Sequence, residues 1–366
     1  MKVIFRISKL GYGGAEQVFL SLAREFKSRY SYNITFVIDQ YVGENIAVAE
    51  DMGCSVISLN ASRTFVTIVP FTKLINNIKP DIIISAYTDT NAACLLSTLI
   101  SRHKPAVIVS EHASLHEHWQ AKSKLKRKIL KFYVGWVYKL SDKVLCVSKG
   151  LQNQVDTLLN QSEKTITIYN PVRFSDTDVS ERTIRTFSKR INLVAVGRIV
   201  PQKDYLTLVK AINEIKKQYP VKLSIVGGTT DTREFDKVKQ EVELCQLTTQ
   251  IEFVDYTDTV EVYYKKADIF VLSSAWEGFG NVIIEAMAFG LPVVATDCNH
   301  GPAEILGNGK FGRLVNVGDS DALATAIIEE WKTPLTKKDA LIMRSQEFSE
   351  NLISQQYHAL INEVVS

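Results

Sequence analysis

The sequence predicts two doubly wound α/β domains of similar size, and three observations lead to this fold class. The chain has 366 residues, which exceeds the roughly 250–300 residues at which a single hydrophobic core stops growing. Short runs of β-branched residues alternate with longer amphipathic stretches, as parallel strands and their covering helices do. This alternation stops once, in a polar stretch near the middle of the chain, and then begins again.

The first half begins with a strand-like run at 3–7 and a helical pattern at 16–26. Further apolar runs without polar alternation follow at 34–38, 81–85, 106–110 and 143–148. Strands that are apolar throughout are typical of parallel sheets covered on both faces. We therefore expect an N-terminal Rossmann-like domain over residues 1–172.

The polar stretch after Asn170 and Pro171 is the predicted linker, residues 173–190. Strand-like runs then return, and they predict a second Rossmann-like domain over residues 191–348; they lie at 191–197, 221–227, 251–254, 268–274 and 292–297. An amphipathic helix is expected in the last segment, 349–366. Open parallel sheets bind ligands beyond the carboxyl ends of their strands, so the two domains are expected to face a central cleft.

Composition narrows the class of protein. Hydrophobic residues make up 46% and charged residues 23% of the chain, a globular balance that excludes a disordered or fibrous protein. No run of about 18 apolar residues predicts a membrane-spanning helix, and Arg6 and Lys9 interrupt the N-terminal run where a signal peptide would be apolar. The five cysteines show no CxxC spacing, which indicates reduced structural thiols in a cytoplasmic protein.

Charge is distributed unevenly along the chain. Residues 1–185 hold 24 Lys and Arg against 16 Asp and Glu, whereas residues 186–366 hold 19 against 24. The densest basic run, 122–131, predicts a helix, within 122–133, whose charged face meets an anionic membrane surface. Apolar residues in and after the run would pack or insert there: Leu125, Ile129, Leu130, Phe132 and Tyr133. A solvated helix face is the alternative for this run. Nucleic acid is excluded as a partner because no extended basic-aromatic stripe is present.

The stretch AWEGFGNVIIEAMAF, 275–289, is the first candidate site. A strand is predicted before it, Asn281 is the expected N-cap of a helix from about residue 282, and Glu285 is expected in the first turn. Backbone amides at a helix N-terminus bind phosphate or other oxygen-rich groups, and Glu277 and Glu285 can accept hydrogen bonds from sugar hydroxyls. The alternative is a capped helix without a ligand.

Two further turns carry candidate phosphate contacts. Arg198 and Lys203 follow a strand that ends at Gly197, which suits a diphosphate clamp; two solvated surface charges are the alternative. Gly13 and Gly14 lie between the first strand and the first helix, the phosphate-turn position of a Rossmann-like domain. Their G-x-G-G spacing does not match G-x-G-x-x-G, so a nicotinamide or flavin site is disfavoured, and a tight turn without a ligand stays open.

His112 follows a predicted strand, and a histidine of near-neutral pKa there can donate a hydrogen bond to a substrate hydroxyl or exchange a proton with it. His116, His118 and Glu117 lie close by, but their spacing fits no familiar zinc site. We therefore predict no metal and no other cofactor.

Together these turns resemble the retaining glycosyltransferases of family 4, which have the GT-B fold. The stretch EGFGNVIIE, 277–285, resembles the E-x7-E signature of that family, and VGRIVPQKD, 196–204, resembles its G-R-x4-K motif. GGAE near the N-terminus, SEH at 110–112 and GLPVVATDCNHGPAEIL at 290–306 resemble further loops of the family. The order of these motifs agrees over nearly the whole chain.

The resemblance assigns a role to each matching position. Arg198 and Lys203 would hold the diphosphate of a nucleotide sugar, Glu285 the ribose hydroxyls, and Glu277 the hydroxyls of the hexose. Further donor contacts are implied at Phe279, Gly280 and Asn281. The turn 251–258 would face the base. In the first domain, Gly13 and Gly14 would approach the phosphates, and His112 would contact the hexose. The resemblance also implies that the last helix returns to the first domain.

The implied reaction is transfer of a hexose or N-acetylhexosamine, with retention at the anomeric carbon, from a nucleotide diphosphate sugar, UDP before GDP. The implied acceptor is a glycan or a lipid-linked saccharide in bacterial surface polysaccharide or lipopolysaccharide synthesis. Such an enzyme would be cytoplasmic and peripheral on the inner face of the cell membrane. The alternatives are a GT-B epimerase or phosphorylase, or a membrane-associated scaffold without catalysis.

Overall fold

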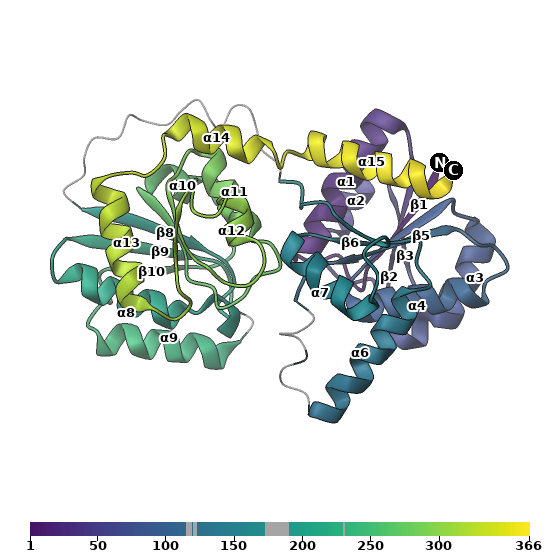
Figure 1. The fold of residues 1–366 in the computed structure, drawn as a ribbon, viewed down its shortest axis with the longest axis horizontal. Coiled ribbons are helices and arrows are strands. Elements are labelled where there is room, and N and C mark those ends of the chain that lie inside the picture. The colour runs from purple at the N-terminus through teal and green to yellow at the C-terminus, as the bar shows by residue number, and fades with distance from the viewer. Residues whose placement is uncertain (115–118, 120–122, 173–189, 230) are drawn as a thin grey trace. The chain divides into compact units, whose positions relative to one another are not determined.

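The computed structural model describes residues 1–114, 119, 123–172, 190–229 and 231–366. The chain divides into two compact units, the first made of Met1–Val172 with Ser349–Ser366 and the second of Arg173–Phe348. Each unit contains a parallel sheet with helices packed around it (Figure 1). Of the expected linker, only Arg190 lies within the described residues.

Unit 1 contains a seven-stranded parallel sheet with the order β3-β2-β1-β4-β5-β6-β7. Its strands are β1 (Lys2–Arg6), β2 (Asn33–Ile38), β3 (Ser55–Ser58), β4 (Ile82–Ala86), β5 (Ala106–Glu111), β6 (Lys143–Cys146) and β7 (Thr165–Thr167). The order reverses between β1 and β4, so the carboxyl ends of these two strands form the topological switch point at which such sheets bind ligands.

The helices of unit 1 follow the strands in alternation, as parallel pairing requires. They are α1 (Gly14–Tyr30), α2 (Ile46–Asp51), η1 (Thr64–Thr67), α3 (Ile68–Ile78), α4 (Thr88–Ile100), α6 (Lys124–Tyr138) and α7 (Lys149–Leu159), together with the C-terminal α15 (Glu350–Val365). Among the described residues, no helix is long and apolar enough to cross a membrane.

The terminal helix α15 packs on α1 within unit 1. Arg24 of α1 forms an ion pair of 3.0 Å with Glu350. The Tyr32 hydroxyl lies 2.7 Å from Nδ1 of His358, and the rings of Tyr30 and His358 stack with centroids 3.7 Å apart. The chain therefore leaves unit 2 after Phe348 and ends on the first unit.

Asp39, at the end of β2, holds a structural ion pair with Arg6, whose side chain is fully buried. Arg6 also donates to the carbonyls of Ile7 and Val37 and to Thr67, while Thr64 donates to the second oxygen of Asp39. Asp39 is therefore used to satisfy a buried guanidinium, which is costly to leave unpaired. In dinucleotide-binding domains an acidic residue at this point binds ribose, whereas Asp39 is engaged by Arg6.

Unit 2 contains a six-stranded parallel sheet with the order β10-β9-β8-β11-β12-β13. Its strands are β8 (Ile191–Val196), β9 (Val221–Val226), β10 (Ile251–Val254), β11 (Ile269–Leu272), β12 (Val293–Thr296) and β13 (Arg313–Val315). The order reverses between the paired strands β8 and β11. This is the switch point of the second unit.

The helices of unit 2 cover both faces of this sheet. They are η2 (Pro201–Lys203), α8 (Tyr205–Lys216), α9 (Thr232–Leu244), α10 (Glu261–Lys266), α11 (Asn281–Ala288), α12 (Pro302–Ile305), α13 (Ser320–Lys332) and α14 (Lys338–Gln346). Apolar residues from β8, β9, α8 and α13 form one continuous core, which fixes the strand ends from which the site loops project.

Candidate active site

Two of the predicted site residues meet at the switch point of unit 2. Lys203 ends η2, shortly after β8, and Glu277 lies in the loop after β11. Because β8 and β11 are hydrogen-bonded neighbours, the two loops leave the same edge of the sheet side by side. The geometry thus places a cation and a carboxylate where doubly wound domains bind their ligands.

Glu277 is held by three donors. Lys203 Nζ and Ser274 Oγ each lie 2.6 Å from Oε1 of Glu277, and Gln202 Nε2 lies 3.3 Å from Oε2. The side chains of Lys203 and Glu277 are only 15% and 7% exposed. A nearly buried pair with added hydrogen bonds is rigid, and loss of either partner leaves an unsatisfied charge.

Gly197 allows Lys203 to reach Glu277. The backbone at Gly197 has φ +152°, and a Cβ atom there would lie 2.8 Å from Cε of Lys203. Tyr205 donates a hydrogen bond of 2.9 Å to the Gly197 carbonyl and so fixes the turn. Arg198 follows directly, is exposed, and forms no ion pair or side-chain hydrogen bond with a described residue. Its guanidinium can therefore bind an anion without breaking a contact seen within the described part of the chain.

The helix after Glu277 begins one residue earlier than predicted. Gly280, with φ +103°, is the N-cap of α11, and Asn281 is the first helical residue, so the prediction of Asn281 as N-cap was wrong. Gly280 turns the chain into the helix through its positive φ. A residue with a Cβ atom, such as asparagine, would be strained at this φ, whereas glycine is not. The N-terminus of α11 lacks a side-chain cap, which leaves partial positive charge at this edge.

Phe279 is 3% exposed, and its ring packs against Phe348 at 5.7 Å between centroids. Because the Phe279 side chain is buried, only the backbone of this residue is suited to a ligand contact. The Phe279 carbonyl lies against Gly301, where a Cβ would approach within 1.8 Å. Glycine at 301, also with φ +103°, is thus required for the loop after β12 to support the loop that carries Glu277.

We had predicted Glu285 in the first turn of the helix, but it lies in the second turn of α11. Its Oε2 accepts a hydrogen bond of 2.9 Å from the hydroxyl of Tyr264, a buried residue of α10. Burial raises the pKa of Glu285, while the Tyr264 hydrogen bond and the charge of Lys203 oppose that shift. No described residue donates to Oε1, so this oxygen can accept from a ligand hydroxyl.

In unit 1 the two predicted site glycines, Gly13 and Gly14, differ in the space around them. A Cβ at Gly13, the N-cap of α1, would lie 2.2 Å from Oε2 of Glu16, a buried carboxylate to which Tyr87 donates at 2.7 Å. A Cβ at Gly14 would meet no atom from elsewhere in the described part of the chain within 4 Å. The fold therefore explains glycine at position 13, whereas the space at position 14 is open to a ligand.

His112 lies just beyond β5 and is held by Ser110. Ser110 Oγ donates its single hydrogen to the Ser85 carbonyl at 2.8 Å, so at the 3.0 Å contact with His112 it must accept, and Nε2 of His112 carries the proton. Nδ1 is then a bare acceptor, and it is buried without a hydrogen-bond partner among the residues that the structure describes. Burial lowers the pKa of His112 to about 3, so the predicted near-neutral pKa was wrong, and the ring suits the acceptance of a hydroxyl hydrogen bond.

A buried polar network supports this histidine. Glu111, 2% exposed, accepts hydrogen bonds from Tyr138 of α6, from Thr88 and from Asn91, and burial raises its pKa to about 7. Asn91 also donates to the Ser110 carbonyl at 3.0 Å. No sequence motif indicates this network, because its members come from three elements that only the fold brings together.

Metal ligands do not gather among the described residues, where no group of three His, Cys, Asp or Glu side chains could hold an ion. His116, Glu117 and His118 lie outside these residues. The residues that sequence reasoning missed are the partners of the predicted ones: Ser274, Gln202, Tyr264 and Gly301. None of them stands out locally, since each acquires its role from a contact with a distant segment.

This arrangement defines a class of protein. A Lys–Glu pair, a nearby exposed arginine and an uncapped helix N-terminus at the switch point suit a ligand that carries both phosphates and hydroxyls. Residues 12–176 match the family described as Glycosyltransferase Family 4, and residues 176–347 match Glycosyl transferases group 1. The chain belongs to the family 4 glycosyltransferases, and its two parallel α/β units are those of the GT-B fold.

Relatives match the chain over nearly its full length. The amylovoran biosynthesis glycosyltransferase AmsD of Erwinia amylovora is 24% identical over 355 residues, 96% of each chain. A Campylobacter jejuni α-1,4-N-acetyl-D-galactosaminyltransferase that acts on a diphosphoundecaprenol-linked saccharide is 25% identical over 368 residues, 97% of this chain and 92% of that protein. The crystal structure of Anabaena HepE in complex with UDP superposes with a TM-score of 0.82 at 20% identity, covering 99% of this chain and all of that one.

Proposed function

We propose that this glycosyltransferase moves a hexose or N-acetylhexosamine from a UDP-sugar donor to a glycan or lipid-linked saccharide. In this proposal the configuration at the anomeric carbon is retained and no metal ion is needed. The observation that carries the proposal is the Lys203–Glu277 pair at the switch point of unit 2. The pair brings a cation, which suits a phosphate, next to a carboxylate, which suits hydroxyls, and this supports a sugar diphosphate as the ligand.

The leaving diphosphate is stabilised by positive charge. Lys203 has three N–H donors, of which Glu277 occupies one, so the ammonium can bind a phosphate while it keeps the carboxylate in place. Arg198 supplies a planar donor set suited to phosphate, and the N-terminus of α11 adds backbone dipoles. These groups take the role that a divalent cation has in other transferases, since they act where negative charge develops.

Glu277 acts as a positioning group and not as the base in this proposal. Lys203, Ser274 and Gln202 already donate to it, so its carboxylate is fixed in position to accept hydrogen bonds from hexose hydroxyls. In a front-face reaction the departing diphosphate oxygen accepts the proton of the attacking hydroxyl. The protein then contributes alignment and electrostatic stabilisation rather than a covalent intermediate.

Glu285 and His112 complete the predicted donor contacts. Glu285 Oε1 would accept from the ribose, while Tyr264 fixes the other oxygen. His112 Nδ1 would accept from a hexose hydroxyl, because the opposite nitrogen donates to Ser110. Gly14 stays a predicted phosphate contact, supported by the open space at its Cα.

Relatives support the choice of substrates. HepE binds UDP, AmsD acts in amylovoran biosynthesis, and the Campylobacter enzyme acts on a polyprenol-linked saccharide. We extend these properties to this chain as a UDP-sugar donor and a surface-polysaccharide or lipid-linked acceptor. Location on the inner face of the cell membrane, through α6, belongs to the same proposal.

A thermal-shift screen against UDP, GDP, ADP, CMP and dTDP, in EDTA, is the first test. A ligand that binds only the native state raises the unfolding midpoint by mass action. We expect UDP to raise the midpoint and Lys203→Ala to reduce this shift. Loss of the shift in EDTA would refute metal independence, and a shift with GDP alone would reassign the donor.

Anomer-resolved NMR of the product then tests retention. Phosphate omission separates transfer from phosphorolysis, because only a phosphorylase needs phosphate to release a sugar phosphate. No turnover with any donor and acceptor, despite UDP binding, would favour a scaffold over an enzyme.

A further inference from the structure

Tyr87 connects β4 directly to α4, since β4 ends at Ala86 and α4 begins at Thr88. Its backbone has φ +75° and ψ +136°. This conformation lies outside the small left-handed region that is open to residues with a Cβ atom, and it is costly for a large side chain. Glycine would adopt it without strain. The tyrosine at this junction therefore indicates a role for the side chain that compensates for the strained backbone.

The junction lies in the middle of the predicted site of unit 1. In the sheet, β4 pairs with β1 on one side and with β5 on the other. The chain after β1 carries Gly13 and Gly14, and His112 follows β5. Because all three strands are parallel, their carboxyl ends meet at one edge. Tyr87 thus leaves the sheet between the predicted phosphate turn and the predicted hexose contact.

The side chain of Tyr87 contacts residues on both sides. Its hydroxyl donates a hydrogen bond of 2.7 Å to Oε2 of Glu16 in α1, a residue that is 2% exposed. Its ring packs beside the imidazole of His112, with centroids 6.3 Å apart and planes tilted by 56°. Tyr87 therefore joins the start of α1, where the glycine turn lies, to the strand end that carries His112.

The Glu16 carboxylate lies against the glycine turn. A Cβ on Gly13 would be 2.2 Å from Oε2 and 2.9 Å from Oε1 of this side chain. A carboxylate in the first turn of a helix is favoured by the helix dipole, but it repels a phosphate that approaches the same backbone amides. The Tyr87 hydroxyl holds Oε2 at Gly13, whereas the space at Gly14 is open within the described part of the chain. The carboxylate is thus kept at one glycine while its neighbour stays accessible.

We propose that Tyr87 is a positioning residue for a diphosphate at the Gly13–Gly14 turn. Its hydroxyl retains the Glu16 carboxylate and so limits the repulsion of the anion. The short junction after β4 fixes the direction of the phenol, which is why a strained tyrosine stands where glycine would suit the backbone. This inference rests on the proposed function, because it assigns Tyr87 to the donor site.

Isothermal titration with UDP and, separately, with inorganic diphosphate tests the proposal. Tyr87→Phe removes the hydroxyl and keeps the ring, and we expect both ligands to bind about tenfold more weakly, as for the loss of a hydrogen bond to a charged group. Glu16→Gln in the same protein should restore most of the affinity, because a neutral amide does not repel phosphate. A hydroxyl that only supports the fold gives no such rescue, since removal of a second contact would weaken binding further.

Tyr41 and Glu50 provide a matched control in the same unit. The Tyr41 hydroxyl donates to Oε1 of Glu50 at 2.5 Å, so this is a second tyrosine–glutamate pair. Tyr41→Phe, alone and with Glu50→Gln, makes the same chemical changes at a pair without a role in the proposed site. Both proteins should bind UDP and diphosphate with unchanged affinity.

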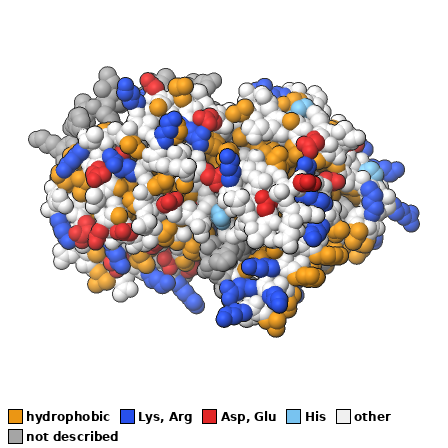
Figure 2. Space-filling view, in the orientation of Figure 1, with side chains coloured by type: hydrophobic (Ala, Val, Ile, Leu, Met, Phe, Trp, Pro, Cys, Tyr) orange, Lys and Arg blue, Asp and Glu red, His pale blue; other side chains and the backbone are white. Residues whose placement is uncertain are grey.

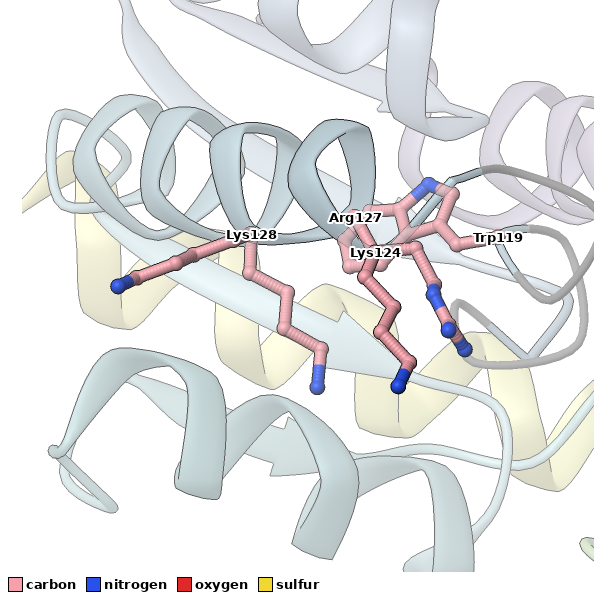
Figure 3. Close-up of a pocket in the computed structure, with 5 residues that line it drawn as sticks. Trp119, Lys124, Arg127 and Lys128 are labelled. Carbon is pink, nitrogen blue, oxygen red and sulfur yellow. The ribbon is translucent and has the colours of Figure 1, made fainter.

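Cations on α6 attract phosphate without belonging to this site. A hollow on this helix is lined by one aromatic and four basic side chains: Trp119, Lys124, Arg127, Lys128 and Lys131. In Figure 3 the labelled basic side chains extend from α6 next to Trp119, and Figure 2 shows Lys and Arg gathered over α6 at the lower edge of the view. Each titration is therefore repeated with Lys124→Gln and Lys128→Gln present, and the loss caused by Tyr87→Phe should persist.

The strain is tested by stability towards urea. Tyr87→Gly and Tyr87→Ala lack the same ring, but only alanine keeps a Cβ atom at this positive φ. Tyr87→Gly should therefore unfold at a higher urea concentration than Tyr87→Ala, while both bind UDP at least as weakly as Tyr87→Phe. Equal urea midpoints would contradict the strained junction from which the proposal starts.

Unchanged binding in Tyr87→Phe, or a loss that Glu16→Gln does not reverse, would overturn the role of Tyr87 and leave the proposed function intact. Binding of diphosphate but not of UDP to the unaltered protein would refute the UDP donor, and the diphosphate titrations would still decide the role of Tyr87. Binding of neither ligand to the unaltered protein would refute both proposals.

Discussion

Lys203 Nζ lies 2.6 Å from Oε1 of Glu277, and this contact joins the two halves of the proposed donor site. The resemblance assigns one residue to the diphosphate and the other to the hexose, yet within unit 2 they form a single nearly buried unit. A ligand that binds Lys203 therefore also affects the position of Glu277. The reacting bond of a sugar diphosphate lies between these two recognition elements.

Substitution of this pair should separate binding from reaction. Lys203→Ala removes a cation from the leaving group, and we expect transfer to fall at least about a hundredfold, as for other transition-state donors, with UDP affinity reduced as well. Glu277→Gln keeps the shape and the Ser274 contact, so we expect about a ten- to hundredfold loss of transfer with UDP affinity retained. Isothermal titration and initial rates measure both. Equal losses of UDP affinity in the two variants would contradict the division of roles.

The Glu285–Tyr264 contact makes a prediction about ribose. Glu285→Ala should weaken UDP binding about ten- to hundredfold, because a charged hydrogen-bond acceptor is lost. Tyr264→Phe should weaken it about fivefold, since Glu285 Oε2 loses its only described donor. The control ligand is 2′,3′-dideoxy-UDP. Its affinity should be the same in all three proteins, and a parallel loss would show that Glu285 acts through the fold.

Gly14 and Gly13 give opposite predictions. Gly14→Ala adds a methyl group where no neighbouring described residue comes within 4 Å, so the unfolding free energy should change by less than about 1 kcal/mol. Transfer should fall if phosphate approaches there. Gly13→Ala displaces the Glu16 carboxylate and should destabilise unit 1. Chemical denaturation and rates are measured on both. A fully active, stable Gly14→Ala protein would remove Gly14 from the site.

Glu111 makes the stability of the protein depend on pH. Its folded pKa of about 7 lies above the ordinary 4.5, so the native state holds more protons than the unfolded state between these values. The unfolding free energy should therefore fall as pH rises from about 4.5 to 7, by up to about 3 kcal/mol. Glu111→Gln cannot ionise and should remove this fall. Urea denaturation at pH 5 and pH 8 tests it, and identical pH slopes in both proteins would contradict the raised pKa.

His112 changes the pH dependence of stability in the opposite direction. Burial lowers its pKa from 6.5 to about 3, so stability from the neutral ring is complete above pH 6.5 and is lost as pH falls towards 3. Nitrogen-15 NMR should show an unprotonated Nδ1 and no titration of this ring between pH 5 and 8. The missing signal in His112→Gln assigns the resonance. A protonated Nδ1 would reverse the tautomer and the predicted hexose contact.

The central, fully buried strands were predictable from the sequence because they are largely apolar. β4, for example, is buried at every position, and a fully buried parallel strand needs no polar alternation. β3 and β7 were not predicted, because Ser55, Ser58, Thr165 and Thr167 interrupt short edge strands. β13, which begins with Arg313, was missed for the same reason. Edge strands are only half covered, so their sequences carry a weaker signal.

The sequence by itself determined the two α/β repeats, the turns that carry the site and the identity of Arg198, Lys203, Glu277 and Glu285, because these depend on local order along the chain. Only the tertiary structure decided that Lys203 contacts Glu277, that Tyr264 holds Glu285 and that Ser110 sets the tautomer of His112. It also decided that Leu130 and Tyr133 of α6 are half-buried, whereas Leu125, Ile129 and Phe132 are exposed. The physical reason is that hydrogen bonding and burial depend on which distant segments share a strand end, and this is fixed by the order of strands in the sheet.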